Sequence, residues 1–233
     1  MRHPLLLATL ACAASLSAAA AQLPTTHTPT TGPARPEVLV PLSGTWTADY
    51  EDARQILTVQ GAGDRKAPDA AAAETLFGAS GGASLVKSLA DPGAFTIAAA
   101  RGVTDFRGGQ ISVRFKLVAG ATDQTAGIVF NLKPDGSYTY ARYNTKDGNV
   151  AIWKFENGAR TVLKHGEAHE QLPLDTWHTL TVTVTGANVT ASAHGGTLTV
   201  AHTLPGPVSG RVGVWTKNDS VTAFRDYFVR GKH

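Results

Sequence analysis

Aromatic and polar side chains alternate along one short segment of the sequence, Ser137–Asn144. Alternate side chains of a strand point to the same face, so Tyr138, Tyr140, Arg142 and Asn144 are expected to share one. An arginine buried without a partner is costly, which makes this face poor core material. Aromatic rings stack on pyranose rings, and guanidinium and amide groups hydrogen-bond sugar hydroxyls. The pattern favours a sugar site, with a structural polar network as the alternative.

Further candidate ligand-binding residues come from segments expected to lie beside this one. If the first four face the concave side of a sheet, adjacent strands should bring into the same groove Arg114, Asn131, Lys154 and Lys217. A single β-bulge would turn a strand's side chains to the opposite face. On this hypothesis Arg142→Ala weakens glycan binding about tenfold with little loss of stability. In the network alternative, Arg142 or Lys217 simply pairs with Asp219 or Asp226.

A second group of residues could ligate a metal ion. His165, Glu167 and His169 lie within six residues that also include Glu170. Imidazole and carboxylate groups are ligands for zinc and similar ions. Histidines four residues apart face one ion on a helix, but this stretch lacks helical periodicity. We therefore expect a solvated loop and no cofactor, with a divalent metal as the alternative.

The elements that must position these residues are predicted to be strands. The segment Ile111–Leu117 alternates apolar and polar residues, as a half-buried strand does. Hairpin turns are indicated by Asp135-Gly136, Asp147-Gly148 and Asn157-Gly158, which separate strand-like runs. About a dozen short strands without long helices predict an all-β fold, a two-sheet antiparallel jelly-roll sandwich.

Two N-terminal segments of this domain are harder to interpret. Residues Ala70–Phe77 could form one or two helical turns or a loop insertion. The segment Thr45–Ala48 should be a strand that pairs with strands late in the chain, because sandwiches commonly bring their ends together. Trp46, Trp177 and His178 are interpreted as structural residues. Trp153 is interpreted as a core residue, with a stacking platform as the alternative.

The first 21 residues have the layout of a secretory signal peptide. A positive start, an apolar run and Ala19-Ala20-Ala21 precede Gln22. Residues 22–37 are rich in proline and threonine and are expected to form a disordered linker, leaving residues 38–233 as one domain. We expect a periplasmic or secreted protein without a membrane span in its mature form. In the alternative, Cys12 is lipidated.

Composition excludes several classes of protein. With 42% hydrophobic and 17% charged residues, the chain is neither disordered nor a long solvated coiled coil. The net charge of +3 falls to about +2 without the signal peptide, which removes Arg2. This small excess does not indicate a nucleic-acid-binding face, and no nucleic-acid partner is expected. We expect a monomer.

Several motifs together resemble a known superfamily. They are GIVF at Gly127, YTYARYN at Tyr138, GNVAIWK at Gly148, WHTL at Trp177 and GRVGVWTKNDSVT at Gly210. In this order they resemble bacterial secreted domains of the concanavalin A-like lectin/glucanase superfamily. Within it, they are most similar to laminin-G-like domains grouped with the 3-keto-disaccharide hydrolases. The resemblance implies a jelly roll with a glycan site on its concave face or rim.

Departures from the pattern bear on catalysis. The resemblance implies an acidic pair after the phenylalanine that corresponds to Phe224, but here Phe224 is followed by Arg225-Asp226. The carboxylate trio of retaining glucanases is absent, so classical two-carboxylate hydrolysis is not expected. The first function hypothesis is therefore a carbohydrate-binding protein. The alternatives are a hydrolase or lyase acting on a 3-keto sugar and an envelope interaction domain.

Overall fold

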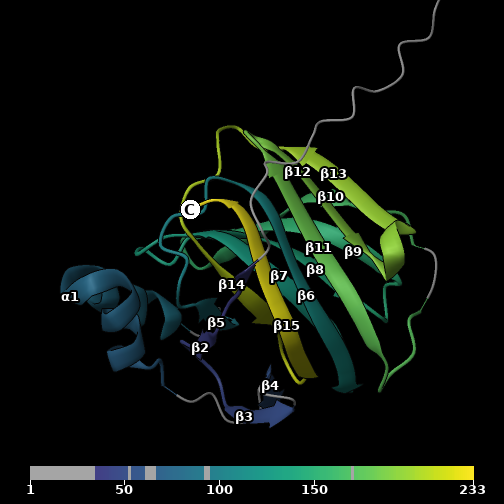
Figure 1. Ribbon diagram of the computed structural model, residues 1–233, viewed down its shortest axis with the longest axis horizontal. Coiled ribbons are helices and arrows are strands. Elements are labelled where there is room, and N and C mark those ends of the chain that lie inside the picture. The colour runs from purple at the N-terminus through teal and green to yellow at the C-terminus, as the bar shows by residue number, and fades with distance from the viewer. Residues whose placement is uncertain (1–34, 52–53, 61–66, 92–94, 169–170) are drawn as a thin grey trace, which may run out of the picture.

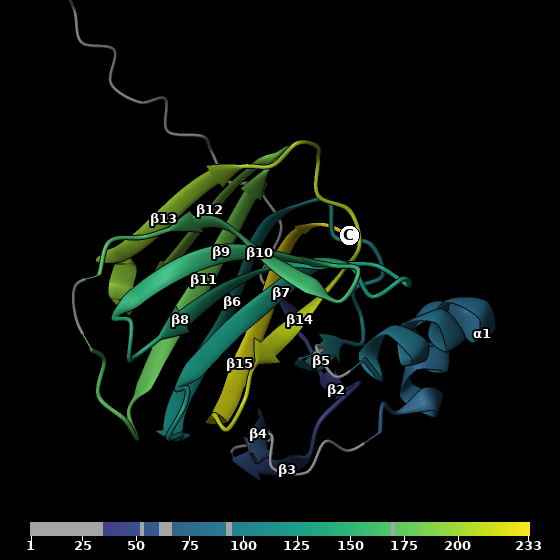
Figure 2. The same ribbon diagram turned by 180° about the vertical axis from the view of Figure 1, so that it is seen from behind.

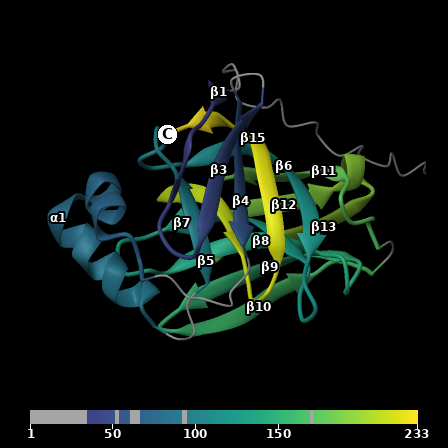
Figure 3. The ribbon, with the colours of Figure 1, turned by 90° about the horizontal axis from the view of Figure 1, so that it is seen from below.

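The computed structural model describes residues 35–51, 54–60, 67–91, 95–168 and 171–233. Two antiparallel sheets pack face to face, and one helix lies at their side (Figure 1). Figure 3 shows the two layers, with β3, β4 and β15 in one and β8, β9 and β10 in the other. This confirms the all-β, two-sheet jelly-roll sandwich predicted from the strand pattern.

We call the first layer sheet A. Its strand order is β13-β12-β11-β6-β15-β4-β3, and β1 also pairs with β15. The strands are β13 (Leu198–Thr203), β12 (Asn188–Ala193), β11 (Trp177–Thr185), β6 (Gly108–Ala119), β15 (Val221–Lys232), β4 (Arg54–Gln60), β3 (Trp46–Glu51) and β1 (Arg35–Pro36). A short 3₁₀ turn, His194–Gly196, joins β12 to β13.

The second layer, sheet B, has the order β10-β9-β8-β7-β14-β5-β2. Its strands are β10 (Ala159–His165), β9 (Asn149–Glu156), β8 (Tyr138–Asn144), β7 (Thr125–Leu132), β14 (Arg211–Thr216), β5 (Thr96–Ala100) and β2 (Leu39–Pro41). All three predicted Asx-Gly turns join neighbouring strands in this sheet. At the β9–β10 turn, Asn157 and Gly158 both have positive φ, as a tight two-residue hairpin loop requires.

The inner faces of the two sheets form the main core. Alternate residues of β6 are buried, among them Val113, Phe115 and Leu117. They meet residues of sheet B such as Ile128 and Phe130. The alternation read from the sequence therefore sets which side chains point inward.

The N-terminal strands pair differently from the prediction. β3 pairs with β4 and not with a late strand, whereas β4 and β1 both pair with β15. β1 also begins three residues before Val38, the first residue of the expected domain. The chain then crosses from sheet A to sheet B, where β2 pairs with β5.

Helix α1 (Ala70–Leu89) is longer than the one or two turns considered from the sequence. Asp69 caps it by accepting a hydrogen bond from the Ala72 N–H at 2.9 Å. A kink at Gly78, with φ 73°, divides it into two halves that fold against each other. At Gly82 a Cβ atom would lie 2.7 Å from the backbone of Glu74, so glycine permits this close approach. The residues that look like helix breakers in the sequence instead shape a bent helix.

Helix α1 packs on sheet B with its apolar residues. Leu76, Leu85 and Leu89 are buried against the outer face of the sheet, in a second apolar cluster separate from the main core. Figure 2 shows α1 beside β5 and β14. No helix in the described ranges has the length and apolar character needed to cross a membrane.

Candidate functional site

The four side chains predicted to share one face of β8 all lie on the outer face of sheet B. Tyr138 and Tyr140 belong to the apolar cluster beneath α1. Arg142 and Asn144 continue the same face toward the β8–β9 turn. Each is at most 4% exposed, so none of them is the open surface that the sequence suggested. The face separates into an aromatic part and a polar part.

Stacked rings form the aromatic part, which runs across the strands of sheet B. Trp153 on β9 lies directly opposite Tyr140, with ring centroids 6.4 Å apart and planes 12° apart. On the other side of Tyr140, the Trp215 ring stacks at 4.2 Å. We call Trp153, Tyr140 and Trp215 the aromatic row. Trp215 is fully buried and Trp153 is partly exposed, so the row opens toward β10.

A glycine between two strands makes this row possible. Gly127 on β7 lies opposite both Arg142 and Trp215. A Cβ atom at Gly127 would lie 2.9 Å from Cε3 of Trp215. Without a side chain at this position, Trp215 can reach across β7 to stack on Tyr140.

The open end of the row contains buried polar atoms without hydrogen-bond partners among the described residues. These atoms are the Tyr140 hydroxyl oxygen and Trp153 Nε1. Burial raises the pKa of Tyr140 to about 12, opposed by the nearby Arg160 and Arg142 guanidinium groups. Buried polar atoms without partners are uncommon in proteins and require an explanation.

Two side chains of β10 border the same end. The Arg160 guanidinium carbon lies 5.2 Å from the centroid of the Trp153 ring. The His165 ring meets Trp153 edge-on, with centroids 5.5 Å apart. Both are exposed, and sequence analysis assigned no ligand contact to Arg160. The hairpin register was the available signal, because the Asn157-Gly158 turn places Arg160 opposite Phe155 on this face.

The polar part of the face is built around Arg142. Its Nη1 donates to the Asn149 backbone carbonyl oxygen at 3.1 Å and to Asn149 Oδ1 at 2.7 Å. Its Nη2 pairs with Asp147 Oδ2 at 2.7 Å. The Arg142 side chain is 5% exposed and that of Asp147 is 47% exposed. Arg142 therefore ties the β8–β9 turn to the strands with every charge partnered.

Lys217 joins the same network through a carboxylate that the sequence analysis did not consider. Lys217 Nζ pairs with Asp123 Oδ1 at 2.8 Å. Asn144 Nδ2 donates to both Asp123 and Asp147, at 3.4 and 3.2 Å. Lys217 thus lies near Asn144 and Arg142, as expected, but its partner is neither Asp219 nor Asp226. Asp123 and Asp147 are each ion-paired with a cation. This arrangement suits two ionised carboxylates and not the pair of one carboxylic acid and one carboxylate that glycoside hydrolysis uses.

Three predicted residues lie away from this face. Arg114 is on β6 in sheet A and points to its outer side. Lys154 lies opposite Thr139 and pairs with Glu156 at 2.7 Å, on the other side of β9 from Trp153. Asn131 has a positive φ of 57° at a register shift between β7 and β14, and its Oδ1 accepts from the Ser209 N–H. The expectation that these three share the groove is wrong.

The metal candidates are placed only in part. His169 lies outside the described residues, while His165 and Glu167 are exposed near the end of β10. No group of three His, Cys, Asp or Glu side chains capable of holding a metal ion occurs in the described part of the chain. Here His165 instead contacts an aromatic ring.

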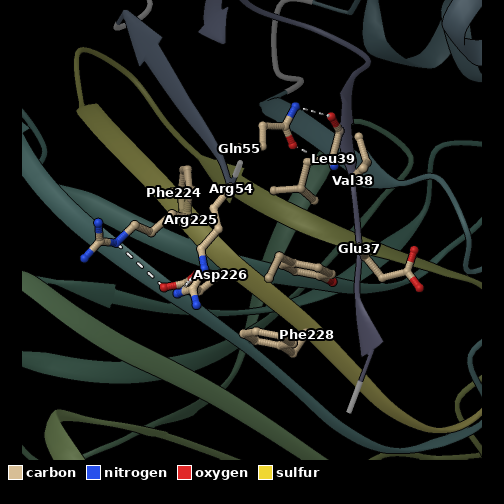
Figure 4. Close-up of a pocket in the computed structure, with 10 residues that line it drawn as sticks. Glu37, Val38, Leu39, Arg54, Gln55, Phe224, Arg225, Asp226 and Phe228 are labelled. Carbon is tan, nitrogen blue, oxygen red and sulfur yellow. Dashed lines mark hydrogen bonds and ion pairs between the residues drawn. The ribbon is translucent and has the colours of Figure 1, made fainter. Parts of the chain in front are cut away.

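A cavity of about 400 Å³ lies elsewhere, where β15 changes partner from β4 to β1 (Figure 4). Its walls include Leu39, Phe224 and Asp226, and none of the predicted site residues. The Gln55 side chain closes one side by pairing with both backbone groups of Leu39. The cavity therefore marks a junction between the sheets and is separate from the β8 face.

Comparison with known proteins identifies the fold class. No family model matches the chain, and no curated protein is similar to it in sequence. Among solved structures, the carbohydrate-binding module CBM66 from Bacillus subtilis has 13% identity and a TM-score of 0.57, covering 82% of this chain and 94% of that one. A Bacillus subtilis protein of unknown function with a galectin-like fold has 12% identity and a TM-score of 0.50, covering 83% and 90%. The chain has a concanavalin A-like jelly-roll fold.

Proposed function

We propose that the protein is a carbohydrate-binding jelly-roll domain whose ligand contacts the open end of the aromatic row. The observation that carries the proposal is Trp153 Nε1, a buried donor without a hydrogen-bond partner among the described residues, in the row that also holds the buried Tyr140 hydroxyl. The Trp153 ring is partly exposed, and the Arg160 guanidinium beside it is exposed. A sugar presents apolar C–H faces and hydroxyl groups together, which matches both features. The fold shared with CBM66 supports the same class of ligand.

The geometry assigns a role to each residue at this end. Trp153 supplies the ring on which a sugar packs, and its indole N–H can donate to a hydroxyl. Arg160 lies over that ring, so a ligand would displace its guanidinium and hydrogen-bond to it. His165 meets the Trp153 ring edge-on. Arg142 is already saturated by Asn149 and Asp147 and is not assigned a ligand contact.

Titration with a panel of neutral oligosaccharides tests the proposal, using cello-, laminari-, malto- and xylo-oligomers. Trp153→Phe keeps a ring but removes the N–H donor and should weaken the best binder about tenfold. Arg160→Gln should weaken it by a similar factor. Tyr50→Ala, which removes an exposed aromatic ring from β3, is the matched control and should bind normally. Binding that is equal in all variants, or absent for every sugar of the panel, would contradict the proposal.

The hydrolase or lyase alternative, acting on a 3-keto sugar, makes a different prediction. It requires a base beside an activated C–H bond, and product formation in the same incubations would favour it. The paired state of Asp123 and Asp147 supports binding over hydrolysis. We keep binding as the proposed function for this reason.

We further propose that the protein acts outside the cytoplasm as a monomer. The proposed location rests on the signal-peptide pattern of residues 1–21, which lie outside the described residues. N-terminal sequencing of the periplasmic fraction should give Gln22 as the first residue. Lipid on Cys12 and recovery in the membrane fraction would contradict it. Size-exclusion chromatography with light scattering tests the monomer.

A further inference from the structure

The outer face of sheet A gathers positive charge around a single indole ring. Arg114 and Lys116 lie on β6, Arg225 on β15 and Trp177 on β11. The guanidinium carbon of Arg225 lies 4.3 Å from the centroid of the Trp177 ring. Lys116 Nζ lies at 5.4 Å and the Arg114 guanidinium carbon at 5.8 Å from the same ring. We call these four residues the Trp177 cluster.

The strand register places like charges directly against each other in this cluster. Arg225 and Arg114 are cross-strand partners in the β15–β6 pair. Like charges at such positions destabilise a sheet, and contact with an aromatic face offsets only part of the repulsion. Fold stability alone does not account for three cations around one ring.

Among the described residues, Asp226 is one carboxylate that contacts the cluster. Asp226 pairs with Arg54 at 3.2 Å and lies 3.7 Å from Arg225 Nε. In Figure 4 the Arg225 guanidinium points away from Glu37 and Leu39. Among the residues that the structure describes, no carboxylate pairs with Arg114 or Lys116. Arg114 and Lys116 therefore contribute positive charge that no carboxylate in the described part of the chain pairs.

A row of hydroxyl groups continues from the cluster across sheet A. Thr179 lies opposite Arg114, and Thr181 lies opposite Ser112. Thr181 also faces Ser192 on β12. These side chains are partly or fully exposed on the outer face. A group of cations beside a row of hydroxyl donors and acceptors matches a ligand with one anionic group and several hydroxyls.

We propose that the Trp177 cluster is a second binding site, which takes an acidic sugar. Its carboxylate or sulfate group binds between Arg114, Lys116 and Arg225 through charge-assisted hydrogen bonds. The ring hydroxyls then contact Thr179 and Thr181. A single compact group of cations fits one anionic substituent, whereas a nucleic-acid backbone needs a track of cations along its phosphates. The site lies on the opposite sheet from the aromatic row and does not depend on it.

Calorimetric titration of the full-length mature protein tests this proposal. The ligands are trigalacturonate, sulfated maltotriose and neutral maltotriose, each at low and at physiological ionic strength. At least one of the two acidic sugars should bind more tightly than neutral maltotriose, and its binding should weaken with salt. The first two ligands show whether the site prefers carboxylate or sulfate. The double variant Arg114→Gln/Lys116→Gln should bind that acidic sugar at least about tenfold more weakly.

A charge-matched control separates this site from general electrostatic attraction. Lys87→Gln/Arg101→Gln removes the same charge from exposed positions of α1 and the loop after β5, and should bind as the wild type does. Equal weakening in both double variants, or no acidic sugar bound, would overturn the proposal. Binding of anionic vesicles or single-stranded DNA without acidic sugars would also overturn it. Neutral-sugar binding that depends on Trp153 should persist in the Arg114→Gln/Lys116→Gln variant. The experiment therefore tests the two proposed binding sites independently.

Discussion

Arg142 illustrates how burial changes the role of a residue chosen for its chemistry. Its three hydrogen bonds are all made within the protein, to Asn149 and to Asp147. Replacing it with alanine leaves Asn149 without its donor and removes the packing of a long side chain. We therefore expect Arg142→Ala to lower the free energy of unfolding by about 2–3 kcal/mol, measured by urea denaturation.

The same variant separates the two interpretations made from the sequence. If Arg142 contacts the ligand directly, Arg142→Ala should bind weakly and have nearly normal stability. The observed network instead predicts that the main effect of this variant is a loss of stability. Arg142→Ala protein that unfolds at the wild-type urea concentration would contradict the network. Sequence alone could place Arg142 on the same face as Tyr140, because side chains alternate between the two faces along a single strand. It did not show that Asp147 and Asn149 of the following hairpin saturate the guanidinium, and it could not supply Asp123, the partner of Lys217, which comes from the loop before β7.

Gly127 is a second residue whose contribution depends on its neighbours. A side chain there would collide with Trp215, which lies at the buried end of the aromatic row. Gly127→Val should cost about 2–3 kcal/mol and reduce neutral-sugar binding by displacing Tyr140. Thermal unfolding and the sugar titration measure the two effects. Ala141, whose side chain belongs to the main core, gives the control: Ala141→Val should lose stability and keep binding in the molecules that remain folded.

Between elements, the loop before β7 is held by a single carboxylate from the loop before β15. Asp219 accepts hydrogen bonds from the N–H groups of Ala121, Thr122 and Asp123 at 2.7, 2.8 and 2.9 Å. These bonds, led by that from Thr122, lower the pKa of Asp219 from 3.8 to about 2. Since Asp123 contacts both Lys217 and Asn144, Asp219 positions the polar part of the β8 face indirectly.

The lowered pKa gives this carboxylate a defined pH dependence. A group with a depressed folded-state pKa stabilises the fold above its unfolded value and stops doing so as pH falls through the folded one. Asp219→Ala should therefore cost on the order of 2 kcal/mol at neutral pH. The difference from wild type should shrink as pH falls from about 4 toward 2. A difference that does not change with pH would contradict the assigned role. Urea denaturation at each pH measures it.

Helix α1 shows why some elements could not be predicted. The strands have strict alternation and Asx-Gly turns, so their positions and hairpins follow from local sequence. In α1, Gly78, Gly81 and Gly82 are poor helix formers. Gly78 takes a positive φ at the kink, and Gly82 lies close to the backbone of Glu74 in the other half of the helix. The same reasoning applies to Asn131 and Arg225, where bulges change the register. Such shifts arise from packing and leave no pattern in the chain.

At the scale of the whole molecule, the helix and the two sheets give the outer faces different properties. Helix α1 closes one end of sheet B and leaves the Trp153 end accessible, while sheet A stays uncovered at the Trp177 cluster. Leu85 of α1 is fully buried against sheet B. Leu85→Ala should lower stability by about 2–4 kcal/mol without changing acidic-sugar binding, which involves the other sheet. Calorimetry on the folded variant checks the second part, and a parallel loss of acidic-sugar binding would contradict this separation.

The most direct test of the proposed function observes the indole N–H groups themselves. The four tryptophans give four indole signals in a nitrogen–proton correlation spectrum. Trp46 donates to the Ser43 carbonyl oxygen and Trp215 to the Tyr138 hydroxyl, whereas Trp153 Nε1 has no hydrogen-bond partner within the described ranges. Addition of the best neutral oligosaccharide should shift the Trp153 signal most, because a hydroxyl group of the ligand accepts its proton. A spectrum in which the Trp153 signal stays fixed while the sugar binds would contradict the proposed site.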